Sequence, residues 1–168
     1  DANKIHKDIH IQDLHSPMGD NLFDGVISLY TWEHLENPAK VMFNFHRSLK
    51  KGGRLIIIAP NRYCYISIVE RMLPPILKNL SWKILKGRKH MPYPAFFNLC
   101  TKVSLEQEAK RVGFDLKHYK AHDSAPIWFA KIPPLFMLMC LVMSTLNRFE
   151  IFEGMRGTFV AVLVKQDI

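Results

Sequence analysis

Cysteine is scarce in this 168-residue chain, and its few cysteines lie too far apart to form a familiar motif. Cys64, Cys100 and Cys140 are an odd number and include no C-x-x-C pair. This spacing argues against a disulfide scaffold and against a cysteine zinc site. A reducing compartment fits best, so the predicted location is the cytoplasm. Three histidines near the start do not supply a metal site either, because neighbouring residues of a strand point to opposite faces.

The chain also lacks an apolar run long enough to cross a bilayer. Its longest uncharged run, Ile132–Asn147, has sixteen residues, whereas a spanning helix needs about 20. We expect an apolar helical insert at 126–148. Three interpretations stay open for it: a buried cap helix, a contact with a membrane surface, or an apolar tunnel for a substrate.

Acidic side chains are rare in the middle of the chain. Residues 40–111 hold fifteen bases and three acids, whereas residues 1–39 hold two bases and seven acids. The net charge of +8 is therefore concentrated on one part of the molecule. A basic surface suits the phosphates of nucleic acid or of lipid headgroups, and the alternative is an ordinary solvated face.

The first third of the chain reads as a βαβ unit. A short strand at 9–11 precedes a buried strand at 23–30. Asn37 and a following proline begin a helix, and Gly52 with the glycine after it should end that helix. A second buried strand then covers 54–60, and we expect it to run parallel to the first.

The core pattern resumes after a segment rich in aromatic, proline and basic residues. Ser104 and Gln107 form a capping box that begins a helix, and Gly113 ends it. Strands follow at 114–119 and 157–165. The predicted fold class is therefore α/β, with one helical insert after the strand at 54–60 and an apolar one before the last strand.

Several spaced motifs carry a resemblance to a known family. They are FDGVIS at 23–28, EHL at 33–35, NP at 37–38, RSLKKGG at 47–53 and LII at 55–57. In this order they resemble class I S-adenosylmethionine-dependent methyltransferases of the type 11 kind, and residues 104–114 agree more weakly. The resemblance implies a Rossmann-like methyltransferase sheet, a single domain over 1–168, and S-adenosylmethionine as cofactor.

One family feature is missing, since no G-x-G occurs anywhere in the sequence. The family places this glycine loop before an acid that holds the cofactor ribose, and Asp1 falls near that acid's position. The resemblance thus implies the C-terminal portion of a methyltransferase domain with its first strands missing, which would be inactive alone.

By the same resemblance, Asp13 accepts a hydrogen bond from the adenine amino group, with the Leu14 backbone beside it. Ser28, Leu29 and Tyr30 line the methionine part of the cofactor. These residues follow the ends of the predicted strands, where parallel sheets bind their ligands.

Glu33 and His34 allow two interpretations. Histidine titrates near neutral pH, so the pair could act as general acid and base on the acceptor. Alternatively, both orient their loop. No metal is expected in the reaction.

The insert at 61–102 lies where the family usually places its substrate lid. Its basic residues are Lys78, Lys83, Lys86, Arg88 and Lys89, interleaved with Trp82, Tyr93 and several leucines. Apolar surface with a basic rim suits an amphiphile at a membrane better than RNA. The predicted function is methyl transfer to a small, hydrophobic or lipid-like acceptor, with peripheral membrane contact. The alternatives are a non-catalytic binding module and an RNA methyltransferase.

Overall fold

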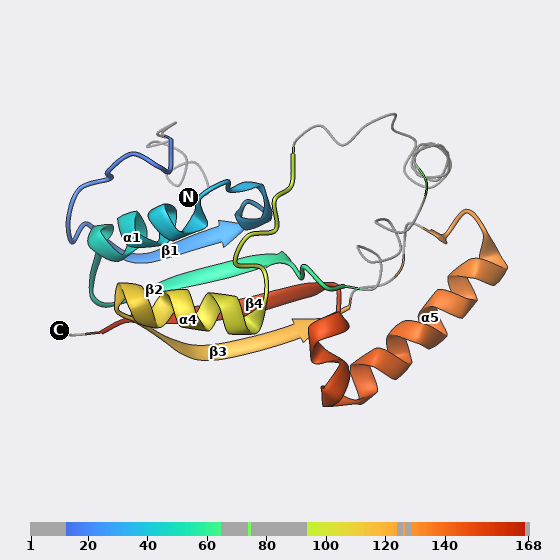
Figure 1. Cartoon of the computed structure of the whole chain (residues 1–168). Coiled ribbons are helices and arrows are strands. Elements are labelled where there is room, and N and C mark those ends of the chain that lie inside the picture. Colours follow the sequence, from blue (N-terminus) through green and yellow to red (C-terminus); the bar gives the residue numbers. More distant parts are fainter. Residues whose placement is uncertain (1–12, 65–73, 75–93, 124–125, 127–128, 167–168) are drawn as a thin grey trace, which may run out of the picture.

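Four strands form one sheet in the computed structural model of the chain (Figure 1). The structure describes residues 13–64, 74, 94–123, 126 and 129–166. Within these residues the strand order is β1-β2-β4-β3. The strand expected at 9–11 and most of the insert expected at 61–102 lie outside the described residues.

The predicted βαβ unit is present. Strand β1 (Phe23–Leu29) and strand β2 (Leu49–Pro60) run parallel, and helix α1 (Pro38–Ser48) connects them. Asn37 caps α1, since its side-chain oxygen accepts a hydrogen bond from the backbone N–H of Lys40 at 3.1 Å. This local signal placed the start of the helix correctly.

The expected end of that helix is wrong by several residues. Helix α1 ends at Ser48, and β2 begins at once with Leu49. Phe23 pairs with Leu49, but Gly25 already pairs with Arg54, so the intervening residues of β2 bulge out of the ladder. Gly52 does adopt the left-handed conformation, at φ +70°, yet it serves this bulge and not a helix cap.

One strand of this four-stranded sheet runs opposite to the other three. Strand β4 (Thr158–Lys165) lies between β2 and β3 (Phe114–His122), pairing antiparallel with both. Helix α4 (Lys102–Val112) precedes β3 and ends at Gly113, at φ +99°, as expected.

The cap that begins α4 was misassigned from the sequence. Thr101 is the N-cap, and its hydroxyl oxygen accepts from the backbone N–H of Ser104 at 3.3 Å. Ser104 therefore lies inside the first turn. Both residues are good caps, and the sequence pattern alone favoured the one with glutamine three residues later.

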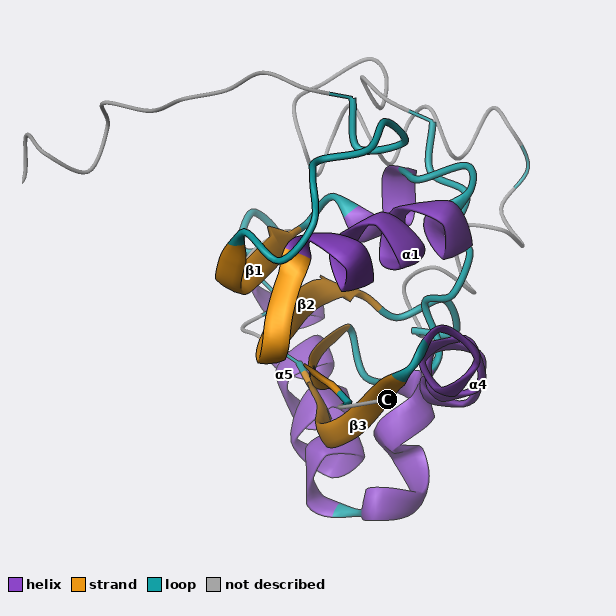
Figure 2. Ribbon diagram, turned by 90° about the vertical axis from the view of Figure 1, so that its left-hand side faces the viewer, coloured by secondary structure: helices purple, strands orange, loops and turns teal. Residues whose placement is uncertain are grey.

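The core lies on one face of the sheet. Helices α1 and α4 cover this face, and Figure 2 shows both on the same side of the strands. Alternate residues of the two central strands point into this core, as a pleated strand requires. The buried core side chains include Val41, Met42, Phe45, Leu55, Ile57, Ala59, Leu105, Ala109, Phe159, Ala161 and Leu163.

Strand β1 is much more exposed than its sequence suggested. Phe23, Ile27 and Leu29 are 43%, 69% and 57% exposed. Among the described residues β1 pairs only with β2, and these three side chains point to the face that α1 does not cover. The expectation of a buried strand is therefore wrong within the described residues, because burial depends on neighbouring segments and not on the strand's own composition.

Helix α5 (Pro133–Arg148) lies within the apolar insert expected at 126–148 and leads into a short 3-10 helix, η5 (Glu150–Met155). Figure 1 shows it extending away from the sheet, with its C-terminal end near the ends of β3 and β4. Only Met143 and Leu146 on this helix are buried. The interpretation as a buried cap helix does not hold for its outer part.

Arg156 fastens this helix to the sheet. Its guanidinium group is buried and donates hydrogen bonds to four backbone carbonyl oxygens. Three belong to the C-terminal end of α5 (Leu146, Asn147 and Phe149), and the fourth is that of Ala121 on β3. The Glu153 carboxylate accepts from the N–H of Ala121 at 3.4 Å, so both polar backbone groups of this residue on the sheet edge are satisfied.

Candidate functional site

The carboxyl ends of β1 and β2 lie side by side, and three of the residues expected to hold the cofactor, Ser28, Leu29 and Tyr30, are found there. The N–H of Tyr30 donates to the carbonyl of Ile58 at 2.8 Å, which extends the pairing of the two strands. Ser28 is buried, whereas Leu29 and Tyr30 are 57% and 54% exposed. Two apolar side chains are thus open to a ligand at the edge where parallel sheets bind theirs.

Tyr30 has an unusual backbone conformation. Its φ is +49°, in the left-handed region that non-glycine residues rarely adopt. The hydroxyl of the next residue, Thr31, donates a hydrogen bond to the carbonyl of Leu29 at 3.1 Å and so stabilises the turn. Backbone strain of this kind concentrates at ligand sites.

Asp13 and Leu14 lie in a turn beside α1. The backbone N–H of His15 donates to Oδ1 of Asp13 at 3.0 Å, and the His15 ring Nδ1 lies 3.1 Å from the same oxygen. These hydrogen bonds lower the pKa of the exposed Asp13 carboxyl. Asn44 on α1 donates to the carbonyl of Leu14 at 3.0 Å, which fixes the turn to the helix. Asp13 is therefore ionised at neutral pH, and Oδ2 takes part in none of these bonds.

Glu33 is a buried acidic residue of the short 3-10 helix η2 (Trp32–His34). Its side chain is 8% exposed, and its Oε2 has no hydrogen-bond partner among the described residues. Burial raises the pKa of this carboxyl, because the charged form loses its hydration. A buried carboxyl oxygen without a partner is costly, because it loses its hydration and gains no hydrogen bond.

His34 holds a distant part of the chain. Its ring Nδ1 lies 2.8 Å from the carbonyl oxygen of Pro94, a distance that requires the ring nitrogen to donate. Its Nε2 lies 3.8 Å from Oε1 of Glu33. The ring is therefore engaged on both sides by its surroundings.

Three further hydrogen bonds reinforce this connection. The carbonyl of Glu33 accepts from the N–H groups of Phe96 and Phe97, at 2.8 and 3.1 Å, and Asn98 donates to the carbonyl of Glu36 at 2.9 Å. We call this set of contacts, between residues 33–36 and 94–98, the clasp. It fixes the end of the 61–102 insert to the loop that follows the candidate cofactor site.

Sequence reasoning did not find the clasp. Asn98 lies 62 residues from its partner in the chain, and no local pattern marks it. The insert is also fixed where it leaves β2, because the N–H of Asn61 donates to the carbonyl of Gly157 and the N–H of Arg62 to that of Cys100. Asn61 could have been suspected from its position directly after a strand.

Two of the sequence-based site assignments fall outside the described residues. Asp1 is one, and the basic group around Lys78 to Lys89 is the other. The structure therefore brings together Ser28, Leu29 and Tyr30 and joins them through the same loop to the Glu33 and His34 pair. Within the described ranges, no group of three or more His, Cys, Asp or Glu side chains could hold a metal ion.

The residues at this edge, and Asp13 in the turn beside α1, have side chains of the kinds that S-adenosylmethionine requires. An ionised carboxylate at Asp13 suits an exocyclic amine. The exposed Leu29 and Tyr30 side chains offer apolar surface, and the left-handed conformation of Tyr30 forms a turn directly after the strand.

The parallel β1–α1–β2 unit, followed across the sheet by antiparallel β4 and then by β3 in the direction of β1 and β2, is the Rossmann-like α/β arrangement of methyltransferases. A family model described as "Methyltransferase domain" matches residues 1–119, which is most of the chain. The chain therefore belongs to this methyltransferase family, and S-adenosylmethionine is the family's cofactor. The family, fold class and enzyme class expected from the sequence are confirmed.

Solved structures agree on the fold. A SAM-dependent methyltransferase of Thermotoga maritima, described as a possible histamine N-methyltransferase, superimposes with a TM-score of 0.58 at 16% identity, covering 98% of this chain and 67% of its own. A protein of Bacillus halodurans assigned as a methyltransferase gives 0.54 at 16% identity, covering 99% and 75%. One of Galdieria sulphuraria assigned as a sarcosine dimethylglycine methyltransferase gives 0.52 at 18%, covering 92% and 57%.

The chain thus spans between 57% and 75% of the length of these three proteins. No curated protein matches it. Within the described part of the chain, no helix combines the length and the apolar character that crossing a membrane requires.

Proposed function

We propose that the protein transfers a methyl group from S-adenosylmethionine to a small apolar or lipid-like acceptor. The cofactor would supply an electrophilic methyl group on its sulfonium. Such a transfer is mainly an alignment problem, because the acceptor atom must approach the methyl group in line. The protein's task is therefore to hold both molecules and to keep the acceptor nucleophilic.

The cofactor residues of this proposal are those at the strand ends. Asp13 and the Leu14 backbone would bind the adenine, and Ser28, Leu29 and Tyr30 would line the methionine part. The exposure of Leu29 and Tyr30 and the left-handed φ of Tyr30 support the second assignment.

For Glu33 and His34 we propose a positioning role. His34 donates through Nδ1 to Pro94, so this nitrogen is committed to the clasp. Glu33 is buried, and its backbone carbonyl accepts from the N–H groups of Phe96 and Phe97, so this residue also belongs to the clasp. Together they would hold the end of the acceptor-side insert against the cofactor loop.

One observation supports an apolar acceptor more than any other. Helix α5 exposes large apolar side chains and carries no charge before its last residue, Arg148. This helix and the insert at 61–102 are the two segments added to the sheet, and both combine apolar residues with a basic surround. Such apolar surface suits a molecule with a long apolar portion.

The acceptor class can be tested with methyl-labelled S-adenosylmethionine. The protein, expressed from the start codon of its gene, is incubated separately with a membrane lipid extract and with total RNA. We expect label to enter the organic phase of the lipid reaction. Label in the RNA would replace the lipid-like acceptor by a nucleic acid, and label in neither, with the cofactor still bound, would favour a non-catalytic binding module.

A further inference from the structure

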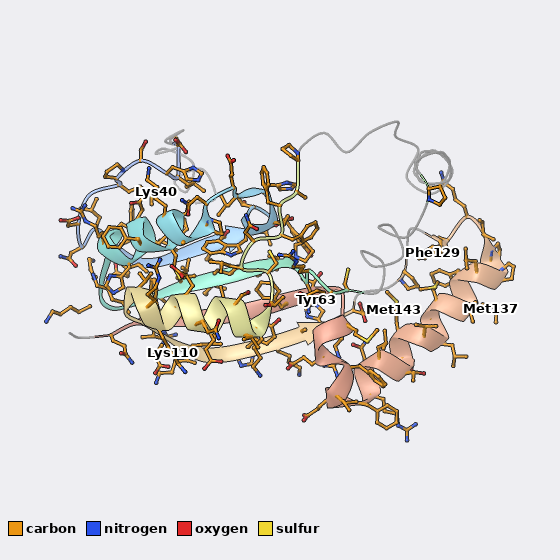
Figure 3. All side chains as sticks on the ribbon, viewed as in Figure 1. Lys40, Tyr63, Lys110, Phe129, Met137 and Met143 are labelled. Atoms are coloured by element: carbon orange, nitrogen blue, oxygen red, sulfur yellow. The ribbon has the colours of Figure 1, made fainter. Side chains whose placement is uncertain are left out.

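Helix α5 has two different faces. Met143 and Leu146 are 8% and 9% exposed and pack toward the domain. Met137, Leu138 and Leu141 are 71%, 54% and 66% exposed. Figure 3 shows Met137 and Met143 on opposite sides of the helix, with Met143 on the side nearer the sheet.

The exposed apolar residues form one stripe. Positions 137, 138 and 141 are spaced by one, three and four, so their side chains lie together on a single helix face. Ile132, 37% exposed, precedes the first turn. We call Ile132, Met137, Leu138 and Leu141 the outer stripe. Soluble monomers rarely expose contiguous apolar surface of this kind unless something binds it.

The position of α5 makes the outer stripe accessible. The helix is fastened at its C-terminal end, where Arg156 bonds the carbonyls of Leu146, Asn147 and Phe149. From there it extends away from the sheet, so its first turns are the farthest from the core (Figure 1). A rigidly fastened helix with an apolar outer end can present that end to another surface.

The charges around the outer stripe indicate what that surface is. No acidic residue occurs between Asp123 and Glu150, and the charged residues in this interval are Lys131 and Arg148. They lie just before and at the end of α5, on either side of the outer stripe. A protein interface usually has a rim of both signs with hydrogen-bonding groups. An apolar stripe between cations matches the headgroup and acyl boundary of an anionic bilayer.

We propose that the outer stripe of α5 docks the protein on the surface of a membrane that contains anionic lipid. The helix lies in the interface with its apolar side chains among the upper acyl segments and with Lys131 and Arg148 near lipid phosphates. The docking proposal rests on the proposed function and adds to it. A docked enzyme would reach an apolar acceptor within the membrane, so the acceptor would not have to pass through water.

Vesicle sedimentation tests the docking surface. The protein is mixed with vesicles of phosphatidylcholine alone and of phosphatidylcholine with phosphatidylglycerol. We expect wild type to sediment with the mixed vesicles, and Leu141→Glu and Met137→Glu to weaken binding about tenfold or more, since each removes a buried apolar side chain from the contact. The matched control is Val103→Glu on α4, because Val103 is equally exposed at 66% but lies outside the outer stripe.

Three outcomes would overturn the docking proposal: wild type that stays in solution, substitutions in the stripe that leave vesicle binding unchanged, or Val103→Glu weakening it as strongly. Size-exclusion chromatography of the same variants tests whether the outer stripe instead binds a second copy of the chain. Loss of a dimer without loss of vesicle binding would assign the outer stripe to self-association. Methyl transfer is measured in parallel on detergent-dispersed lipid extract. Transfer without vesicle binding defeats only the docking proposal, and vesicle binding without transfer to any acceptor defeats only the proposed function.

Discussion

Replacing Arg156 by methionine is expected to lower the free energy of unfolding by about 3–5 kcal/mol. Methionine fills a similar volume but leaves four backbone carbonyls without their donor, those of Leu146, Asn147, Phe149 and Ala121. Each buried unsatisfied group costs about 1–3 kcal/mol, and water at the helix end recovers part of the loss. The C-terminal end of α5 would detach from β3 first.

Denaturant titration measures this effect, and Arg148→Met is the matched control. Arg148 is the last residue of the same helix and is exposed, so its replacement should change stability little. If Arg156→Met unfolds at the same denaturant concentration as wild type, Arg156 does not fasten α5 in the way the hydrogen bonds indicate.

Replacing Glu33 by glutamine is expected to stabilise the protein at neutral pH by about 1–3 kcal/mol, because a neutral amide costs less to bury than an ionised carboxylate. Burial raises the pKa of Glu33 above its ordinary value of 4.5. A raised pKa means that its favourable contribution is complete below the unfolded-state value and is lost as the pH rises through the folded-state value. The glutamine side chain of the variant cannot ionise, so the difference in stability between variant and wild type should grow over that interval.

Unfolding free energies measured across the acidic to neutral range give this difference directly. Glu36→Gln is the control, because Glu36 lies in the same loop but is exposed. Parallel pH curves for wild type and Glu33→Gln would contradict an unpaired buried carboxyl at this position. If Glu33 has a positioning role, Glu33→Gln should change the Michaelis constant for the acceptor and leave the pH profile of kcat unaltered. If Glu33 is a general base, the same substitution should change the pH profile of kcat.

The sequence predicted the parts of the fold that local signals determine. Asn37 followed by proline marks a helix start in almost any context, and Gly113 marks a helix end, so both were placed correctly. The burial of β1 could not be read in this way, since Ile27 and Leu29 have the composition of a core strand and their exposure depends on which segments cover them. The burial of a strand therefore depends on the segments packed against it and not on its own sequence.

For the candidate site too, the sequence revealed the residues that local motifs mark and missed those brought together by folding. Ser28 to Tyr30 could be identified because they end a strand that a family motif contains. The clasp could not, because Pro94 and Asn98 meet His34 and Glu36 across about sixty residues of chain. Arg156 was missed for a related reason: a single arginine after a helix is normally solvated, and only the folded chain brings its four carbonyl partners together.

The central claim is that S-adenosylmethionine binds at the carboxyl ends of β1 and β2, with Asp13 as a hydrogen-bond acceptor for its adenine. Calorimetric titration of the cofactor into the protein, expressed from the start codon of its gene, tests this most directly. We predict saturable binding that Asp13→Ala weakens about tenfold through loss of a hydrogen-bond acceptor, while Asp20→Ala, an exposed acid of the same loop paired with Arg47, leaves it unchanged. No binding of S-adenosylmethionine, or binding that both substitutions leave unaltered, would contradict the assignment.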